Sequence, residues 1–288
     1  MNSPLKNLQR LRANFTGSLQ LSSEIWILLL DLLREGGDLK PEYRVSPTRS
    51  REKRWRDKSR VLDLDSITEE LTLHPADGIM LQYREDEPGA HNITLSHLHA
   101  VGAVQPFFIG EQLEPCEIVR KNNRNIMRAL ASHPNFLSGV LHETYYSSWM
   151  NTGDIKYYNR FFGDSTLCQL KSRPSGEISY SGEIKEDWRI DTSRHPGRIE
   201  ACVSGARSVA ADMWMGPRFW TPAACTPEEV RAQSWLRIEE NQNYMHINCW
   251  PEPFTRPDGE QGELQRKLWR LLFNGESQWP PKGDLPNS

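Results

Sequence analysis

The sequence predicts an α+β fold, with mainly antiparallel sheets and packed helices, over a chain of 288 residues. Short stretches of alternating apolar and polar residues recur in both halves, and turn signals separate them, as in hairpins. Two longer segments, residues 115–132 and 259–273, carry their apolar residues along one helical stripe. Short strands together with separate amphipathic helices are typical of the α+β class.

The length favours one large domain or two small ones. We expect a single domain over residues 1–288. Both halves follow a strands-and-helix plan, so the alternative is two similar halves, about 1–150 and 151–288. A folded chain of this size buries roughly three quarters of its unfolded surface, so it needs no disulfide or metal for stability.

The first half begins with a predicted helix over residues 23–35, since Ser22 and Ser23 favour a helix start and Gly36 a stop. The stretch Tyr43–Arg60 carries eight basic residues against two acidic ones and predicts a loop or a frayed helix. Residues 85–89 read as the turn of a hairpin. The strands predicted in this half are Arg60–Asp65, Ile67–Leu73, Gly78–Arg84, Asn92–Leu98 and Phe107–Gly110.

Residues 115–162 are predicted to be richer in helix. Pro115–Ser132 has a helical stripe, and His133-Pro134 ends it. Phe136–Trp149 is apolar and fits a helix or a strand. Asp154–Phe162 reads as a short aromatic helix that Gly163 closes.

The second half returns to sheet. Thr226-Pro227-Glu228-Glu229 has the cap, proline and acids of a helix start. Gly259–Phe273 is the clearest helix, with Asp258 at its start and Gly275 at its end. Ser208–Trp214 fits either a helix or a strand. The predicted strands are Glu177–Lys185, Trp188–Ile190, Ile199–Val203 and the hairpin Ser234–Glu239 with Tyr244–Trp250.

Composition excludes several classes of protein. The chain has 35 Lys and Arg against 38 Asp and Glu, a formal charge of −3, which excludes a globally basic nucleic-acid binder. Five scattered cysteines without a C-x-x-C motif exclude a zinc ribbon and suit a reducing compartment, so we expect a cytoplasmic protein. The longest apolar run, Ile25–Leu33, is far below the ~20 residues of a membrane span.

Two groups of residues could form a metal site or a nuclease centre. His97 and His99 alternate on a predicted strand, as metal ligands can, and His91 lies nearby in the sequence. A metal site needs a third and often a fourth ligand, and Glu111 and Cys116 could serve only if the fold brings them back, so we predict no metal and no cofactor. Asp164, Glu183 and Lys185 resemble the acid and E-x-K core of restriction-endonuclease-like nucleases, in which carboxylates hold a divalent cation. A metal-dependent nuclease using these three residues is the alternative function.

Other catalytic and nucleotide-binding patterns are missing from the sequence. It holds no G-x-S-x-G, no G-x-G-x-x-G and no P-loop motif. The basic stretch contains Trp55 between its charges, a combination that can bind nucleic acid, but we interpret it as a solvated loop and do not expect a nucleic-acid partner.

Aromatic residues concentrate in the second half, where seven of the ten tryptophans lie at or after position 188. Most must fill the core. Trp, Met and Arg together are also favoured in the cores of protein interfaces, and the densest run is Met213–Trp220. We predict that Trp214 or Trp220, with Arg218, reaches the surface and contacts a protein partner.

One resemblance covers residues 195–273. It rests on His195-Pro196-Gly197-Arg198, on the run Met213–Trp220, on Cys249–Phe254, on Asp258-Gly259-Glu260-Gln261 and on the leucines of Gln265–Phe273. Together these segments resemble bacterial immunity proteins of the immunity protein 52 type, encoded beside polymorphic or type VI secretion toxins.

The resemblance implies a non-catalytic cytoplasmic protein that binds and neutralises one cognate toxin. Acidic groups would suit a nuclease toxin, whose active site attracts phosphates. The predicted partner-binding residues therefore include Asp63 and Asp65 as one group and Glu85, Asp86 and Glu87 as another, besides Trp214, Arg218 and Trp220.

Overall fold

The computed structural model describes residues 9–15, 41–45, 60–62, 79–83, 92–99, 106–112, 117–178, 184–202, 205–221 and 223–278. Its helices are α3 Glu117–Ala131, α4 Thr144–Asn151, α5 Ile155–Phe161, α6 Pro227–Arg231 and α7 Gly259–Phe273, with short 3₁₀ helices η1 Ser165–Leu167 and η2 Pro217–Trp220. Its strands are β1 Gln9–Phe15, β2 Pro41–Val45, β3 Arg60–Leu62, β4 Ile79–Tyr83, β5 Asn92–His99, β6 Pro106–Gln112, β7 Phe136–Glu143, β8 Leu170–Ile178, β9 Ile184–Ile190, β10 Glu200–Cys202, β11 Gly205–Arg207, β12 Asp212–Met215, β13 Arg237–Glu240 and β14 Met245–Asn248.

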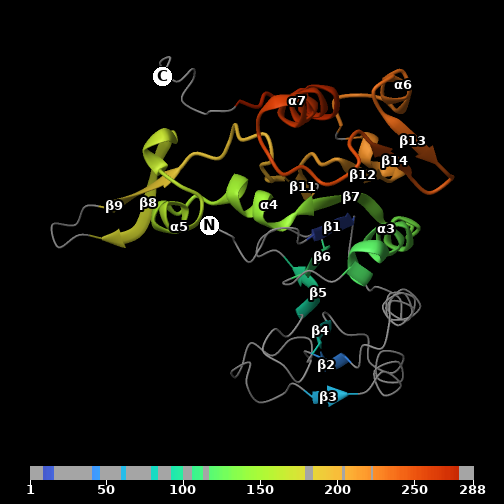
Figure 1. Cartoon of the computed structure of the whole chain (residues 1–288), viewed down its shortest axis with the longest axis horizontal. Coiled ribbons are helices and arrows are strands. Elements are labelled where there is room, and N and C mark those ends of the chain that lie inside the picture. The colour runs from blue at the N-terminus through green and yellow to red at the C-terminus, as the bar shows by residue number, and fades with distance from the viewer. Residues whose placement is uncertain are drawn as a thin grey trace.

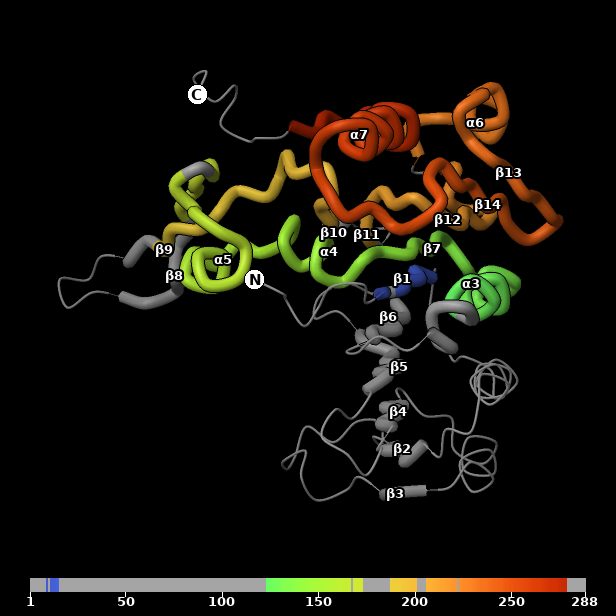
Figure 2. The backbone as a smooth tube through the Cα atoms, in the orientation of Figure 1, coloured from blue at the N-terminus to red at the C-terminus, as the bar shows by residue number. Residues whose placement is uncertain are grey.

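A ten-stranded sheet runs through the molecule in the order β13-β14-β12-β7-β1-β6-β5-β4-β2-β3. Each pairing within it is antiparallel, as are the separate hairpins β8–β9 and β10–β11. The chain colours of Figure 2 show β1, from the start of the chain, directly beside β7 from its middle. The predicted α+β class with mainly antiparallel pairing is confirmed.

Helix α7 covers one face of the sheet at β7, β12 and β14 (Figure 1). Alternation along β12 directs Met213 and Met215 to this face, where they join Leu268 and Leu272 of α7 in the main core. Gly259, whose φ is +57°, and Asn274, whose φ is +48°, lie at the two ends of the helix. The predicted helix Gly259–Phe273 therefore has the right bounds, although a left-handed asparagine before Gly275 makes the C-cap.

Helix α3 covers the opposite face of the sheet. Its residues Ile126, Met127 and Leu130 are buried against β1 and β7. Gly139 lets α3 lie close to β7, because a Cβ at this position would lie 2.3 Å from the Met127 sulfur. Two helices thus sandwich the sheet near β7 and β12, and polar side chains on the α3 side are enclosed rather than exposed.

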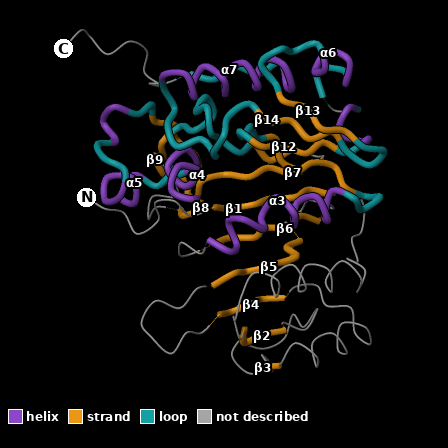
Figure 3. The backbone as a smooth tube through the Cα atoms, turned by 45° about the vertical axis from the view of Figure 1, so that its right-hand side comes forward, coloured by secondary structure: helices purple, strands orange, loops and turns teal. Residues whose placement is uncertain are grey.

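A smaller unit of α5 and the β8–β9 hairpin lies at the end of the molecule away from α3 and α6, as Figures 1 and 3 both show. Its own core holds Tyr158 of α5, Cys168 and Ile190 of β9. Asp154 accepts a hydrogen bond from the Tyr157 amide and caps α5, and Gly163, with φ +119°, follows its end. The predicted short aromatic helix is confirmed.

Most other predicted elements are confirmed where the structure describes them, including the helix within Pro115–Ser132, the hairpin of β4 with β5 and the hairpin of β13 with β14. Thr226 forms a full capping box with Glu229. The ambiguous Phe136–Trp149 is a strand followed by a helix, and β12 shows that Ser208–Trp214 ends as a strand. The predicted helix 23–35 and strand Ile67–Leu73 lie outside the described residues.

Two predictions need correction. Glu177–Lys185 is not one strand, because β8 ends at Ile178 and β9 begins at Ile184, on opposite sides of a hairpin. The same alternation continues on both sides of that turn, so the pattern alone does not mark the break. The ends of Tyr43–Arg60 also belong to strands, since β2 reaches Val45 and β3 starts at Arg60 and the two pair with each other.

Candidate functional site

Trp214, the first predicted partner-binding residue, is wholly buried. It lies opposite His246 on β14 and stacks on that ring with centroids 4.3 Å apart, while its neighbour on β7 is Gly139 beneath Met127. The expectation that Trp214 reaches the surface is therefore wrong. Side chains do alternate between the two faces of β12, with Met213 and Met215 facing α7 and Trp214 on the other face. That other face is covered by α3, so Trp214 is buried as well.

Arg218 and Trp220 both lie on η2, after Gly216. Arg218 is exposed, whereas Trp220 is half-buried and packs edge-on against Phe219 with ring centroids 5.2 Å apart. Their predicted role in partner binding stays a prediction. The acidic residues Asp63, Asp65, Glu85, Asp86 and Glu87 lie outside the described residues.

The residues of the nuclease hypothesis are described only in part. Asp164 is exposed and caps η1, because its carboxylate accepts a hydrogen bond from the Thr166 amide at 2.8 Å. Glu183 lies outside the described residues, and for Lys185 the structure describes only its place in β9. Among the described side chains, no group of three or more His, Cys, Asp or Glu residues is arranged to hold a metal ion.

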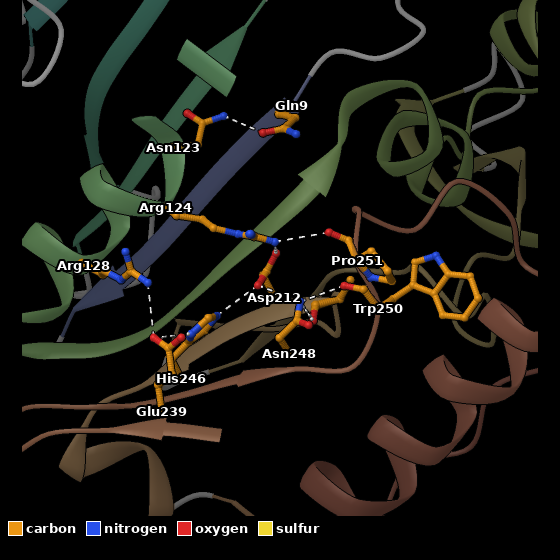
Figure 4. Close-up of polar contacts among 11 residues, drawn as sticks. Gln9, Asn123, Arg124, Arg128, Asp212, Glu239, His246, Asn248, Trp250 and Pro251 are labelled. Atoms are coloured by element: carbon orange, nitrogen blue, oxygen red, sulfur yellow. Dashed lines mark hydrogen bonds and ion pairs between the residues drawn. The ribbon is translucent and has the colours of Figure 1, made fainter. Parts of the chain in front are cut away.

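A buried polar network, which the sequence analysis missed, connects α3 to the sheet (Figure 4). At its centre is Asp212, which is only 1% exposed. Its carboxylate accepts hydrogen bonds from Arg124 at 2.8 Å, Asn248 at 2.9 Å and His246 Nε2 at 3.0 Å. An ionised carboxylate is an acceptor only, so the Nε2 atom carries the proton.

The network continues toward solvent through Glu239. Its carboxylate lies 3.5 Å from His246 Nδ1 and accepts a hydrogen bond from Arg128 at 3.2 Å. Arg124 and Arg128 are one helical turn apart on α3, so both reach the same rim of the sheet. The imidazole of His246 is thus held between two carboxylates, and the network fixes α3 over strands β12, β14 and β13.

Burial alone would raise the pKa of Asp212, but hydrogen bonds from His246 and Arg124 and the positive charge of Arg124 lower it more. The pKa therefore lies below its ordinary value of 3.8. In the unfolded chain the carboxyl returns to that ordinary value. The network consequently stabilises the fold above pH ~4, and this contribution is lost as the pH falls below the ordinary value toward the lowered one.

Asp212→Asn is expected to lower the free energy of unfolding by about 1–3 kcal/mol at neutral pH, and to flatten the loss of stability below pH ~4. The lower part of this range is favoured because Arg124, whose side chain is 45% exposed, can turn to water. Urea unfolding across pH measures both effects. Glu263→Gln, which removes the carboxylate of an exposed ion pair with Arg266, is the control and should change little. Equal pH profiles for wild type and Asp212→Asn would contradict the account.

The segment His195–Arg198, part of the resemblance, is also buried in the structure. Arg198 lies over the Trp269 ring at 3.7 Å and bonds to Glu200, while the Trp269 indole donates to the Pro196 carbonyl at 2.8 Å. Gly197 leaves room for Tyr146, whose ring would lie 2.7 Å from a Cβ there. These residues lock the loop to α7 and α4, so their role is structural.

Four exposed hydrophobic side chains lie on α5 and the β8–β9 hairpin. We call this group the aromatic surface, and it consists of Tyr157 (41% exposed), Phe161 (43%), Leu170 (41%) and Trp188 (55%). These are the large hydrophobic side chains that are exposed in the described part of the chain. All four lie on the small unit whose core joins α5 to β9 through Tyr158 and Ile190.

The rings of α5 form a continuous run of contacts. Tyr157 contacts Phe161 with ring centroids 4.5 Å apart and Phe162 at 5.8 Å, and Phe162 contacts Tyr145 at 5.1 Å. The half-buried Phe162 also packs on buried Tyr158, so the exposed rings are tied to the core beneath them. Such anchoring reduces the entropy that the side chains lose when a partner binds.

Sequence reasoning missed both features. The signal for the network was a charged residue inside the apolar run Val209–Met215 and a histidine between Met245 and Ile247, since polar residues on buried strands need partners. The signal for the aromatic surface was the pair Tyr157-Tyr158 followed four residues later by Phe161-Phe162. One helix buries a single stripe, so two adjacent aromatic stripes leave one exposed.

Comparisons with known proteins identify no family. No protein-family model matches the chain, and no curated protein matches it. A solved structure described as "Pseudomonas aeruginosa T6SS protein PA0821" aligns with a TM-score of 0.47 and 12% sequence identity, over 88% of this chain and 68% of that one. In the described part of this chain, none of the helices is both long and apolar enough to cross a membrane.

Proposed function

We propose that this protein is a non-catalytic immunity protein, which binds and neutralises a cognate bacterial toxin through its aromatic surface. The observation that carries the proposal is the exposure of Trp188, Tyr157 and Phe161 on adjoining elements. Single exposed hydrophobic residues are ordinary, but aromatic side chains gathered at one place are typical of protein interfaces. Trp and Tyr are the residues most enriched among those that dominate binding energy.

The partner class comes from the resemblance of residues 195–273 to immunity proteins of polymorphic or type VI secretion toxins. Buried residues of those segments, such as Arg198 and Trp269, serve the fold, and the exposed aromatic side chains lie on a different part of the chain. We therefore propose the binding surface there. We place the complex in the cytoplasm. Cys168, Cys225 and Cys249 form no disulfide with one another, which suits a reducing compartment.

The test uses the protein encoded by the gene next to this one. We expect the two full-length proteins to co-purify, and co-expression to protect cells from growth arrest caused by the neighbour. A toxic neighbour that forms no complex with this protein and arrests growth equally in its presence would refute the proposal. Plasmid cleavage by this protein alone with Mg²⁺, abolished by Glu183→Ala, would refute it in favour of the nuclease alternative.

A further inference from the structure

We infer that the aromatic surface binds an acidic face of its protein partner, so that carboxylates of the partner meet Lys156 and Arg160 while apolar side chains contact the rings. The inference rests on the proposed function, because it names the kind of partner surface that the same site takes. The described charged side chains around the aromatic surface suggest which charge the partner carries.

The acidic side chains that the structure describes around the aromatic surface already have hydrogen-bond or ion-pair partners. The structure describes four of them between residues 154 and 191. Asp154 and Asp164 accept hydrogen bonds from backbone amides at the starts of α5 and η1. Asp187 pairs with Arg189 at 2.7 Å, and Asp191 pairs with Lys171 at 2.8 Å. These carboxylates keep their charge, but each already has a hydrogen-bond donor or a cation of its own chain as a partner.

The basic side chains of α5 are in a different position. Lys156 and Arg160 are exposed, and neither makes an ion pair with another described residue. Arg160 lies over the Phe161 ring with 4.9 Å from its guanidinium carbon to the ring centroid. Positive charge and exposed aromatic area are therefore adjacent on one helix, and a partner that covers Phe161 must also face Arg160.

Protein fits this surface better than nucleic acid does. A single-stranded nucleic acid needs a positive groove that follows its backbone, together with stacking rings. Here the two hairpin cations whose side chains the structure describes, Lys171 and Arg189, pair with Asp191 and Asp187, and these carboxylates would repel phosphates on the hairpin. An acidic protein patch needs only the two cations of α5, because apolar contacts supply the rest of the interface.

The charges at the edge of such an interface act mainly on the association rate. The test measures binding kinetics of the full-length protein with the product of the neighbouring gene, at several salt concentrations. For Lys156→Glu/Arg160→Glu we expect an association rate about 10-fold lower at low salt, and a weaker dependence on salt. The control Lys267→Glu/Arg270→Glu makes the same charge change at exposed positions of α7 and should leave the rate within about 2-fold of the wild type.

Circular dichroism checks that both double variants are folded. An association rate unaffected by the α5 double variant, or raised by it, would overturn the inference while leaving the proposed function in place. Absence of any complex with the wild-type protein would overturn both.

Labelled single-stranded oligo-dT is the second probe. Binding of oligo-dT that is lost in Lys156→Glu/Arg160→Glu, without binding of the neighbouring protein, would assign the surface to nucleic acid and also overturn the inference.

Discussion

Trp269→Ala is expected to lower the free energy of unfolding by about 3–5 kcal/mol, the range for a large aromatic side chain removed from a core. Trp269 is fully buried on α7 among Leu268 and Leu272. Its loss would leave a cavity, remove the hydrogen bond to the Pro196 carbonyl and take the ring away from Arg198. Arg198 is itself buried, so its charge would lose its aromatic neighbour without reaching water.

Chemical unfolding in urea measures this loss. Trp188→Ala is the matched control, because it removes the same side chain from an exposed position and should change stability by less than about 0.5 kcal/mol. Trp269→Phe, which keeps an aromatic ring, should fall between the wild type and alanine. A loss below about 1 kcal/mol for Trp269→Ala would show that α7 does not depend on this contact.

The second large effect concerns binding. Trp188→Ala and Tyr157→Ala are each expected to weaken the complex with the neighbouring gene's product at least about 30-fold, which corresponds to ~2 kcal/mol, with little change in stability. Both side chains are exposed, so their removal opens no cavity in the core. Most of the change should appear in the dissociation rate, as is usual for buried interface contacts.

Arg218→Ala separates this surface from the one predicted from the sequence. Arg218 is exposed on η2 and lies on a different element from the aromatic surface. Calorimetric titration of the three variants compares the two places. Wild-type affinity for Trp188→Ala and Tyr157→Ala, with a large loss for Arg218→Ala, would move the interface to η2.

The fold was predictable where neighbouring residues in the sequence indicate the start, the end or the buried face of a helix or strand. Helix α7 has apolar residues at helical spacing between Asp258 and Gly275, and α6 has its cap, proline and acids within a few residues. The turn at Asn241 separates β13 from β14 for the same reason. The break between β8 and β9 was not predictable, because both strands of that hairpin continue one alternating pattern.

The site was less predictable because it depends on contacts between distant residues. Asp212 meets Arg124 and His246, which are 88 and 34 residues away along the chain, and no local motif joins them. Trp214 is buried because α3 lies over it, and alternation within β12 contains no information about α3. The aromatic surface had a local signal in the doubled aromatic pairs of α5, but its exposure also depends on how the β8–β9 hairpin packs.

Hydrogen–deuterium exchange of the full-length protein, with and without the product of the neighbouring gene, tests most directly that the protein acts by binding a partner through the aromatic surface. Partner binding should slow exchange of the amides of α5 and β9, where Tyr157, Phe161 and Trp188 lie. Amides of α7, on another part of the molecule, should exchange as in the free protein. Slower exchange confined to η2 and its neighbours, or no change anywhere at saturating partner, would contradict the account.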